Sequence, residues 1–330
     1  MKNGAVIGVG SMGYNHARIL ALNPEVELKG LVDENEELGK KLANHFKTKY
    51  YSTITGLIED NKLDFANVAV PTIYHKRISE QLIRAKIHTL VEKPIAASVE
   101  EGNYLHKLAK ENNIVLLPGH IERYNPAVQD LKKKLNNKEL GQIYRIEVTR
   151  AGPFPSRVQD IGVARDLAVH DLDVINYLLE RKAMKIGCQK QKLIHSSEED
   201  SLVAIITYDE KIVCTLNVNW TSPTKTRSLK IFGQKGMFSL DYINQELRFY
   251  ENKDQTDNEN PWEGQTISEG REIKFPVNKS EPLLNEINYF LMSIDKKKQL
   301  DKEIQSSIDV LNLVDKMEES FITQSFLELK

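Results

Sequence analysis

The sequence predicts an α/β protein with an N-terminal doubly wound parallel sheet and a C-terminal α+β domain whose large sheet is mostly antiparallel. Over residues 1–120, short apolar runs alternate with helical patterns, as in parallel sheets covered by helices on both faces. Beyond residue 120, strand candidates follow one another through tight turns, which is typical of antiparallel pairing. The chain has 330 residues, more than the roughly 250–300 that one core reaches. We therefore expect two domains, residues 1–120 and 121–330.

The expected strands of the first domain are apolar runs that end at Gly, Asp or Pro or at an acidic residue. They cover residues 5–9, 26–32, 50–51, 65–70, 88–91 and 114–117. Helical spacing of apolar residues separates these runs. The expected helices cover residues 11–22, 34–46, 53–59, 74–86 and 99–112. Ser98 and Glu101 form a capping box before the last of them.

The second domain is predicted to contain long strands, with Gly and Asp-Glu turns between them. The strands are expected at residues 142–150, 184–194, 201–208, 211–220, 227–232, 236–241 and 246–250. Helical patterns cover residues 126–136, 165–181, 281–294 and 301–326. The polar and acidic stretch 251–272 is expected to be a solvated loop.

Composition excludes several classes of protein. Lys plus Arg is 45 and Asp plus Glu is 47, so the net charge is 45 − 47 = −2, without the basic excess of a dedicated nucleic-acid binder. No apolar run approaches the ~18 residues of a membrane span, and the N-terminus enters a strand without a secretory signal. Two cysteines, Cys188 and Cys214, are too few for a disulfide framework. We expect a soluble, cytoplasmic protein that binds neither nucleic acid nor membranes.

A glycine motif follows the first strand and opens the first helix. It fits G-x-G-x-x-G with Gly8, Gly10, Ser11, Met12 and Gly13. The glycines allow a tight turn, close approach of a pyrophosphate and close helix–strand packing, and the helix N-terminus favours phosphate. Asp33 follows the second strand, 20 residues beyond the last glycine, where a carboxylate binds ribose hydroxyls and repels a 2′-phosphate. This predicts NAD rather than NADP; the alternative is a structural turn with a surface Asp.

Polar residues follow two further strands of the first domain. Ligands of open α/β sheets bind outside the carboxyl ends of the strands. Glu92 and Lys93 stand at one such end, and Pro71, Thr72 and His75 at another. We expect these residues to line the cofactor site, with Lys93 in the crevice. The alternatives are a solvated lysine and a packing or capping role for His75.

Asp166 and His170 form the second candidate cluster. In a helix, residues four positions apart share a face, so the carboxylate would orient the imidazole and support its basicity. A surface histidine on an acidic helix is the alternative. A His–carboxylate group also suggests zinc, but no second His or Cys lies at ligand spacing, so we expect no metal.

Together, these motifs resemble those of the Gfo/Idh/MocA oxidoreductase family, and the resemblance covers essentially the whole chain. The Glu-Lys-Pro triplet at residues 92–94 is its most diagnostic element. The resemblance implies a Rossmann domain, and a second domain whose open sheet face forms the interface of a homodimer or homotetramer. It also implies that Lys93, His170 and Asp166 form the active site of an NAD-dependent dehydrogenase that acts on a CH–OH group of a sugar.

A narrower similarity links the segments 119–126, 150–153, 157–160 and 166–173 to nucleotide-sugar members of the family, which oxidise the 3-hydroxyl of UDP-N-acetylglucosamine. A diphosphate needs cations, and Arg binds phosphate in a bidentate manner. The expected substrate-binding residues are Arg123, Tyr124, Asn125, Arg157, Lys225 and Arg227. Three alternatives stay open: another sugar, uronic acid or inositol as substrate; a redox-neutral enzyme that recycles its NAD; and a non-catalytic NAD-binding protein.

Overall fold

The computed structural model describes residues 1–155, 161–195, 197–209, 211–252 and 270–329, which fold into two compact units. The first unit comprises Met1–Ile121 and Glu281–Asn312, and the second comprises Glu122–Ser280 and Leu313–Lys330. The predicted division had placed every residue after 120 in the second domain. The structure differs because 281–312 return to the first unit.

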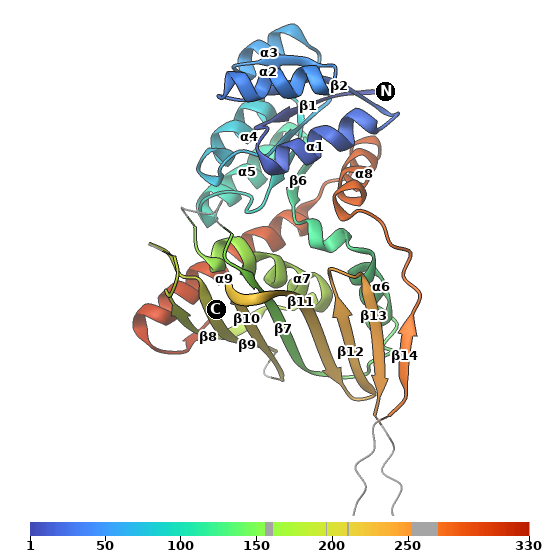
Figure 1. The fold of residues 1–330 in the computed structure, drawn as a ribbon, viewed down its shortest axis with the longest axis vertical. Coiled ribbons are helices and arrows are strands. Elements are labelled where there is room, and N and C mark those ends of the chain that lie inside the picture. Colours follow the sequence, from blue (N-terminus) through green and yellow to red (C-terminus); the bar gives the residue numbers. More distant parts are fainter. Residues whose placement is uncertain (156–160, 196, 210, 253–269, 330) are drawn as a thin grey trace, which may run out of the picture. The chain divides into compact units, whose positions relative to one another are not determined.

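The first unit is built on a parallel sheet of six strands (Figure 1). The strands are β1 (Lys2–Ile7), β2 (Val26–Val32), β3 (Lys49–Tyr51), β4 (Phe65–Val68), β5 (His88–Glu92) and β6 (Leu116–Gly119). Their order is β3-β2-β1-β4-β5-β6, and every pair is parallel. This is the doubly wound order of dinucleotide-binding folds, which confirms the predicted class.

Helices connect these strands. They are α1 (Ser11–Leu22), α2 (Glu36–His45), α3 (Ile54–Asp60), α4 (His75–Arg84) and α5 (Val99–Asn112), with a 3₁₀ turn at Thr72–Tyr74. The capping pair at α5 is present: Ser98 Oγ accepts the Glu101 N–H at 3.3 Å, and the Glu101 carboxylate accepts the Ala97 N–H at 3.1 Å. Apolar clusters fill both faces of the sheet.

Two C-terminal helices complete the first unit: α8 (Pro282–Asp295) and the N-terminal part of α9 (Asp301–Thr323). The buried face of α8 packs on α1 and the sheet, and the rings of Phe290 and Phe65 meet edge to face with centroids 5.8 Å apart. Ile308 of α9 belongs to the cluster on the other face. These apolar contacts explain why 281–312 do not belong to the second unit.

The second unit is built on a sheet of nine strands. They are β7 (Ile143–Pro153), β8 (Ala183–Gln191), β9 (Ser201–Tyr208), β10 (Ile212–Asn219), β11 (Thr221–Gly233), β12 (Gly236–Asp241), β13 (Glu246–Glu251), β14 (Glu272–Phe275) and β15 (Leu327–Glu328). Their order is β14-β13-β12-β11-β7-β10-β9-β8-β15. Only the pair β7–β10 is parallel among the described strands, so the prediction of a mostly antiparallel sheet is confirmed. The short edge strands β14 and β15 were not predicted.

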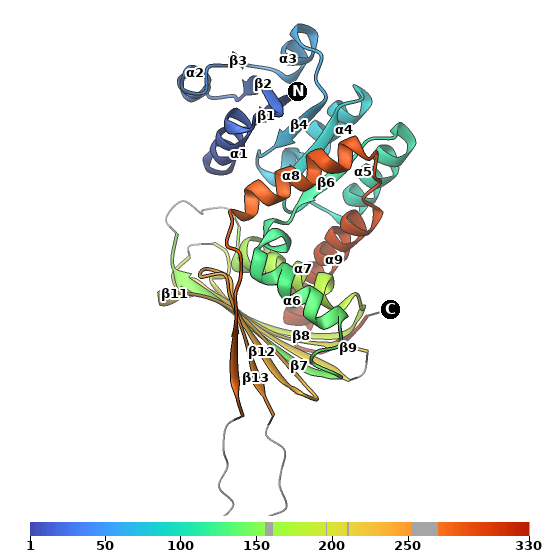
Figure 2. The same ribbon diagram turned by 90° about the vertical axis from the view of Figure 1, so that its right-hand side faces the viewer.

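One face of this sheet is covered by α6 (Pro126–Asn136) and α7 (Val169–Leu179) (Figure 2). Residues 165–181 were expected to form one helix, and this is wrong in its first turn. Ala164–Ala168 form a π-helical turn, and the α-helix begins only at Val169. The wider turn changes which side chains lie above one another, and such turns are frequent at functional sites.

A buried ion pair joins α7 to the 3₁₀ turn Ile121–Tyr124. The Arg123 guanidinium donates to both carboxylate oxygens of Asp173, at 2.6 and 2.5 Å. The side chains are 9 % and 1 % exposed. A buried charge of this kind is tolerated because its partner is buried with it.

We expect Arg123→Leu and Asp173→Leu each to destabilise the chain by about 3–5 kcal/mol, because each removes one member of a buried ion pair. The double variant should be less destabilised than the sum of the two, since it leaves neither charge behind. Urea unfolding of the four proteins measures the difference. Additive effects would show that the two side chains do not stabilise each other.

Candidate active site

The first group of predicted site residues lies at the carboxyl edge of the parallel sheet, where β1, β4 and β5 end. The residues that follow these strands are Gly8–Gly13, Pro71 to His75, and Glu92 with Lys93. Three neighbouring strands end here, so the topology brings together the motifs that the sequence had separated by tens of residues.

The three glycines of the turn serve different purposes. Gly8 has a φ of +84°, which favours glycine, and a Cβ on Gly13 would lie 1.8 Å from the Gly8 carbonyl oxygen. Both are therefore required by the protein's own packing. A Cβ on Gly10 would meet nothing within 4 Å. The chain does not itself need a glycine there, and the open space fits the close approach of a pyrophosphate.

The N-terminus of α1 is suited to an anion. Gly10 is its N-cap and supplies no side-chain hydrogen bond, and the first turn contains no acidic residue. The backbone N–H groups of this turn and the helix dipole attract negative charge. Ser11 and Met12 are exposed at this point. These features fit a dinucleotide.

Asp33 is hydrogen-bonded to the backbone of the same turn. Its Oδ2 accepts the Val9 N–H at 2.7 Å, and its Oδ1 accepts the Asn35 N–H at 2.8 Å. The sequence predicted a ribose ligand here, but not this second role in holding the glycine turn. A carboxylate has about four lone-pair sites, so capacity for ribose hydroxyls is left.

Lys93 is half-buried, and Glu92 beside it is buried. The Glu92 carboxylate contacts His16 Nε2 at 2.9 Å and accepts the Lys93 backbone N–H at 3.3 Å. Pro71 is exposed and Thr72 is half-buried on the neighbouring loop. These positions are compatible with the predicted cofactor site.

His75 is buried, and its ring nitrogens lie 2.8 Å from two backbone carbonyl oxygens, those of Pro94 and Val70. Burial lowers the pKa of His75. Both ring nitrogens thus face carbonyl oxygens inside the chain, and a neutral imidazole donates to one of them. The structure supports the packing role rather than direct cofactor binding, and we do not retain His75 as a ligand.

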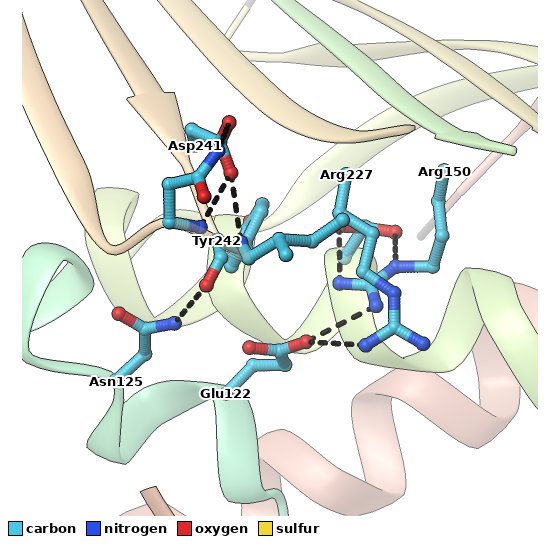
Figure 3. A network of polar contacts seen from close by, with 9 residues as sticks. Glu122, Asn125, Arg150, Arg227, Asp241 and Tyr242 are labelled. Carbon is cyan, nitrogen blue, oxygen red and sulfur yellow. Dashed lines mark hydrogen bonds and ion pairs between the residues drawn. The ribbon is translucent and has the colours of Figure 1, made fainter. Parts of the chain in front are cut away.

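A buried charge network forms the centre of the second unit (Figure 3). Arg150 of β7 is 1 % exposed and donates to both oxygens of Asp171, at 2.6 and 3.1 Å. It also donates to Glu122 at 3.1 Å. Burial opposes the charge of Arg150, but the two carboxylates outweigh it and raise its pKa, so the guanidinium stays charged.

Two further cations lie beside this network. Arg227 is half-buried, with its guanidinium 3.7 Å from the same Glu122 oxygen, and Lys225 on the same strand is exposed. Burial, and then the charge of Arg150, lower the pKa of Arg227. The charge of Arg227 is the main cause that lowers the pKa of Lys225. Lys225 and Arg227 are thus neighbouring cations, and an anionic ligand would relieve the repulsion between them.

Asp166 lies in the π-helical turn, and His170 lies in the first turn of α7; both are half-buried. The charge of Asp166 offsets part of the lowering of the Arg227 pKa, which indicates that this turn lies near Arg227. The expected hydrogen bond between Asp166 and His170 stays a prediction.

The structure gives other roles to two of the predicted substrate ligands. Arg123 is neutralised by Asp173, and Asn125 caps α6 through the Ala127 N–H and donates to the Tyr242 carbonyl oxygen at 3.0 Å (Figure 3). Tyr124, which lies between these two residues in the sequence, is also buried. We therefore do not retain Arg123 and Asn125 as substrate ligands. Arg157, the first expected phosphate ligand, lies outside the described residues.

The sequence analysis missed Arg150, Asp171 and Glu122, although a signal was present. In β7, the buried positions alternate as Ile146, Val148 and Arg150. An arginine on the inward face of a strand requires a buried carboxylate. The alternation of apolar residues along this strand therefore predicts that Arg150 needs a buried carboxylate as its partner.

Among the described residues, no cluster of three or more His, Cys, Asp or Glu side chains is arranged to hold a metal ion. In the same part of the chain, no helix has the length and apolar character that crossing a membrane requires.

Comparisons with known proteins identify the family. The model of the oxidoreductase family with an NAD-binding Rossmann fold matches residues 2–120, and that of the GFO/IDH/MocA C-terminal domain matches residues 128–239. UDP-N-acetylglucosamine 3-dehydrogenase of Acidithiobacillus ferrooxidans is 30% identical over 250 residues, which is 76% of this chain and 77% of that protein. Myo-inositol 2-dehydrogenase of Thermotoga maritima is 22% identical over 249 residues, 72% of this chain and 75% of that protein.

Solved structures agree with this assignment. The UDP-N-acetylglucosamine 3-dehydrogenase GnnA from Acidithiobacillus ferrooxidans superposes with a TM-score of 0.85 at 26% identity, covering 97% of each chain. GenD2 from gentamicin A biosynthesis, solved in complex with NAD, shares the fold with a TM-score of 0.84 at 21% identity, covering 100% of this chain and 96% of the other. The chain therefore belongs to the Gfo/Idh/MocA oxidoreductase family and is an NAD-dependent dehydrogenase of that family.

Proposed function

We propose that this protein oxidises the 3-hydroxyl of a nucleotide sugar, UDP-N-acetylglucosamine, to the 3-keto sugar. The observation that carries the proposal is the pair of neighbouring cations on one strand, Lys225 and Arg227, where the charge of Arg227 is the main cause that lowers the pKa of Lys225. A diphosphate would relieve the repulsion between these two cations, whereas uncharged inositol would not. The 30% identical relative that acts on this substrate supports the same choice.

In the proposed reaction, the hydroxyl group loses a proton and the carbon that carries it loses a hydride. Bound NAD⁺ supplies the hydride acceptor for the carbon that is oxidised. His170 takes the hydroxyl proton, a step in which a positioned base contributes ~10²–10⁴-fold. Lys93 donates a hydrogen bond to the oxygen as negative charge develops on it. Asp166 orients His170.

The cofactor is held by residues of the first unit. The turn Gly8–Gly13 and the N-terminus of α1 bind the pyrophosphate, and Asp33 binds the adenosine ribose. Pro71, Thr72 and Glu92 complete this site. The preference for NAD over NADP rests on the charge of Asp33.

The open face of the nine-stranded sheet supports the expected homodimer or homotetramer. Val203, Ile205 and Val213 point away from the helices and are 49%, 39% and 40% exposed. Apolar residues gathered on one face favour association with a second copy. The expected cytoplasmic location is part of the same proposal.

The function is tested with a panel of UDP-sugars, UDP-uronic acids, inositols and free sugars. We expect NADH absorbance to rise with UDP-N-acetylglucosamine, and NMR of the product to show a ketone at C3. Oxidation of inositol alone would replace the proposed substrate. Tightly bound NAD with product but no net NADH would indicate a redox-neutral enzyme, and no turnover with any compound would indicate a binding protein.

Variants of Lys225 and Arg227 test whether these two cations bind the diphosphate. Arg227→Met and Lys225→Met remove charge but keep much of the apolar stem. We expect each to raise KM for the UDP-sugar about tenfold, the effect of losing ~1.4 kcal/mol of binding, with KM for NAD unchanged. An unchanged sugar KM in both variants would mean that the diphosphate binds elsewhere.

Lys93→Ala and His170→Ala should each lower kcat by two or more orders of magnitude, because each removes a group that acts on the reacting hydroxyl. NAD binding, measured by titration calorimetry, should stay within a few-fold of the wild-type value. Full turnover by either variant would remove that residue from the catalytic set.

Asp33→Ala should raise the ratio of kcat/KM with NADP to that with NAD, because the charge that repels the 2′-phosphate is lost. Both cofactors should also bind less tightly, since Asp33 holds the Val9 N–H. The ratio, and not either affinity alone, is therefore the measurement. A ratio equal to that of the wild type would show that Asp33 does not contact the ribose.

A further inference from the structure

The π-helical turn that carries Asp166 begins without a cap from its own segment. The first N–H groups of a helical turn have no partner inside the turn and need an acceptor from elsewhere. Gly162 and Val163, which precede the turn, have no polar side chain, and Val163 at the N-cap position makes no side-chain hydrogen bond. The acceptor must therefore come from a different part of the chain.

Glu199, in the loop before β9, supplies this acceptor with both its backbone and its side chain. Its carbonyl oxygen accepts the Val163 N–H at 3.1 Å, and its Oε1 accepts the Ala164 N–H at 3.1 Å. Glu199 lies 35 positions beyond Ala164 in the sequence. A carboxylate at the N-terminus of a helical segment also interacts favourably with the helix dipole. Glu199 thus caps the turn from a distant segment.

A buried cation holds the Glu199 carboxylate in turn. Lys190 Nζ of β8 lies 3.2 Å from Glu199 Oε2 and also pairs with Glu318 of α9. The side chains of Lys190 and Glu199 are 9 % and 11 % exposed. Burial opposes the charge of Lys190, but the two carboxylates outweigh burial and raise its pKa. One oxygen of the Glu199 carboxylate therefore faces the cation, and the other binds the turn.

Gly162 makes room for this carboxylate. It is buried, and a Cβ at this position would overlap the carboxyl group of Glu199. The backbone of Gly162 does not lie in the left-handed region, so the conformation itself also suits alanine. The close approach of Glu199 is therefore what favours glycine here, and an alanine would displace the end of the Glu199 side chain.

The start of this turn is connected directly to Asp166 and His170. The Asp166 N–H donates to the Gly162 carbonyl oxygen at 3.0 Å. The turn then continues without a break into α7, in which His170 is the second residue. Because a helical backbone relates the positions of its residues, a shift at Ala164 is passed on to both side chains.

We propose that Glu199 is a positioning residue that caps the π-helical turn and thereby sets where Asp166 and His170 lie. Lys190 and Gly162 allow its carboxylate to reach the Ala164 N–H. The effect on turnover rests on the proposed function, in which His170 takes the hydroxyl proton. The effect on the turn itself does not depend on which substrate is oxidised.

The first test measures the cap by hydrogen exchange, resolved to single amides by mass spectrometry. In Glu199→Ala, the Ala164 amide should exchange about tenfold faster, because it loses its acceptor. The Val163 amide is the internal reference and should stay within about threefold of the wild-type rate, because its acceptor is a backbone carbonyl oxygen. Equal acceleration of both amides, or of neither, would overturn the proposal.

Gly162→Ala removes the same hydrogen bond in an independent way, because the added methyl group displaces the carboxylate. It should accelerate the Ala164 amide as Glu199→Ala does, and the double variant should exchange no faster than either, since one bond is lost only once. Glu198→Ala is the matched control, because it removes a carboxylate from the neighbouring residue of the same loop. Acceleration in this control, or additive acceleration in the double variant, would overturn the proposal.

The second test uses turnover of the sugar. Glu199→Ala and Gly162→Ala should each lower kcat about tenfold and leave KM for NAD within about threefold, because the base is displaced and the cofactor residues are not. Glu199→Gln keeps an acceptor oxygen for the Ala164 N–H, so it should restore most of kcat and slow the exchange again.

A merely structural role would reduce the amount of folded enzyme without changing kcat per folded molecule. Wild-type kcat in Glu199→Ala, or a loss in Glu199→Gln as large as in Glu199→Ala, would overturn the proposal. If the wild type oxidises no sugar, the proposed function fails, and the exchange experiment still decides whether Glu199 caps the turn.

Discussion

The arrangement of the second unit depends on a buried arginine, Arg150, whose charge requires carboxylates from other elements. Arg150 lies on the inward face of β7 and is almost completely buried, so it must be paired. Asp171 from α7 and Glu122 from the 3₁₀ turn provide the carboxylates. Three elements that are distant in sequence are thereby held at one point. Glu122 also contacts Arg227, so one carboxylate lies beside two guanidinium groups.

The first unit uses buried polar groups in the same way, at the edge of its sheet. Asp33 holds the backbone of the glycine turn, and Glu92 holds the backbone of Lys93. Away from this edge the faces of the sheet are packed with apolar side chains. Polar contacts therefore concentrate where the strands end, which is where an open α/β sheet binds ligands. The groups proposed to bind cofactor and substrate are thus supported by neighbours that are already hydrogen-bonded.

Local patterns were sufficient to predict most elements and the class of both sheets. Apolar runs ended by Gly, Pro or charged residues mark strands, and their rhythm distinguishes the parallel half from the antiparallel half. The same patterns failed where distant contacts decide. The amphipathic helix α8 packs on α1 and Phe65 of the first unit, and periodicity alone does not say which core receives it. The π-helical turn at Ala164–Ala168 has the residue pattern of an ordinary helix.

Short sequence motifs indicated the chemistry that we propose: the glycine turn, Asp33, the Glu-Lys-Pro triplet, and Asp166 with His170. These motifs can be recognised because the residues of each lie close together in the sequence. Which polar side chains are left for a ligand depends on contacts between elements that are distant in the sequence. Arg123 and Asn125 belong to the same sequence segment as Glu122, yet Arg123 pairs with buried Asp173 and Asn125 caps α6. Conversely, His16, Asn67 and Glu92 lie far apart in the chain and meet only because β4 and β5 are neighbours beneath α1. Burial of a polar group demands a partner, and only the folded chain determines which partner is within reach.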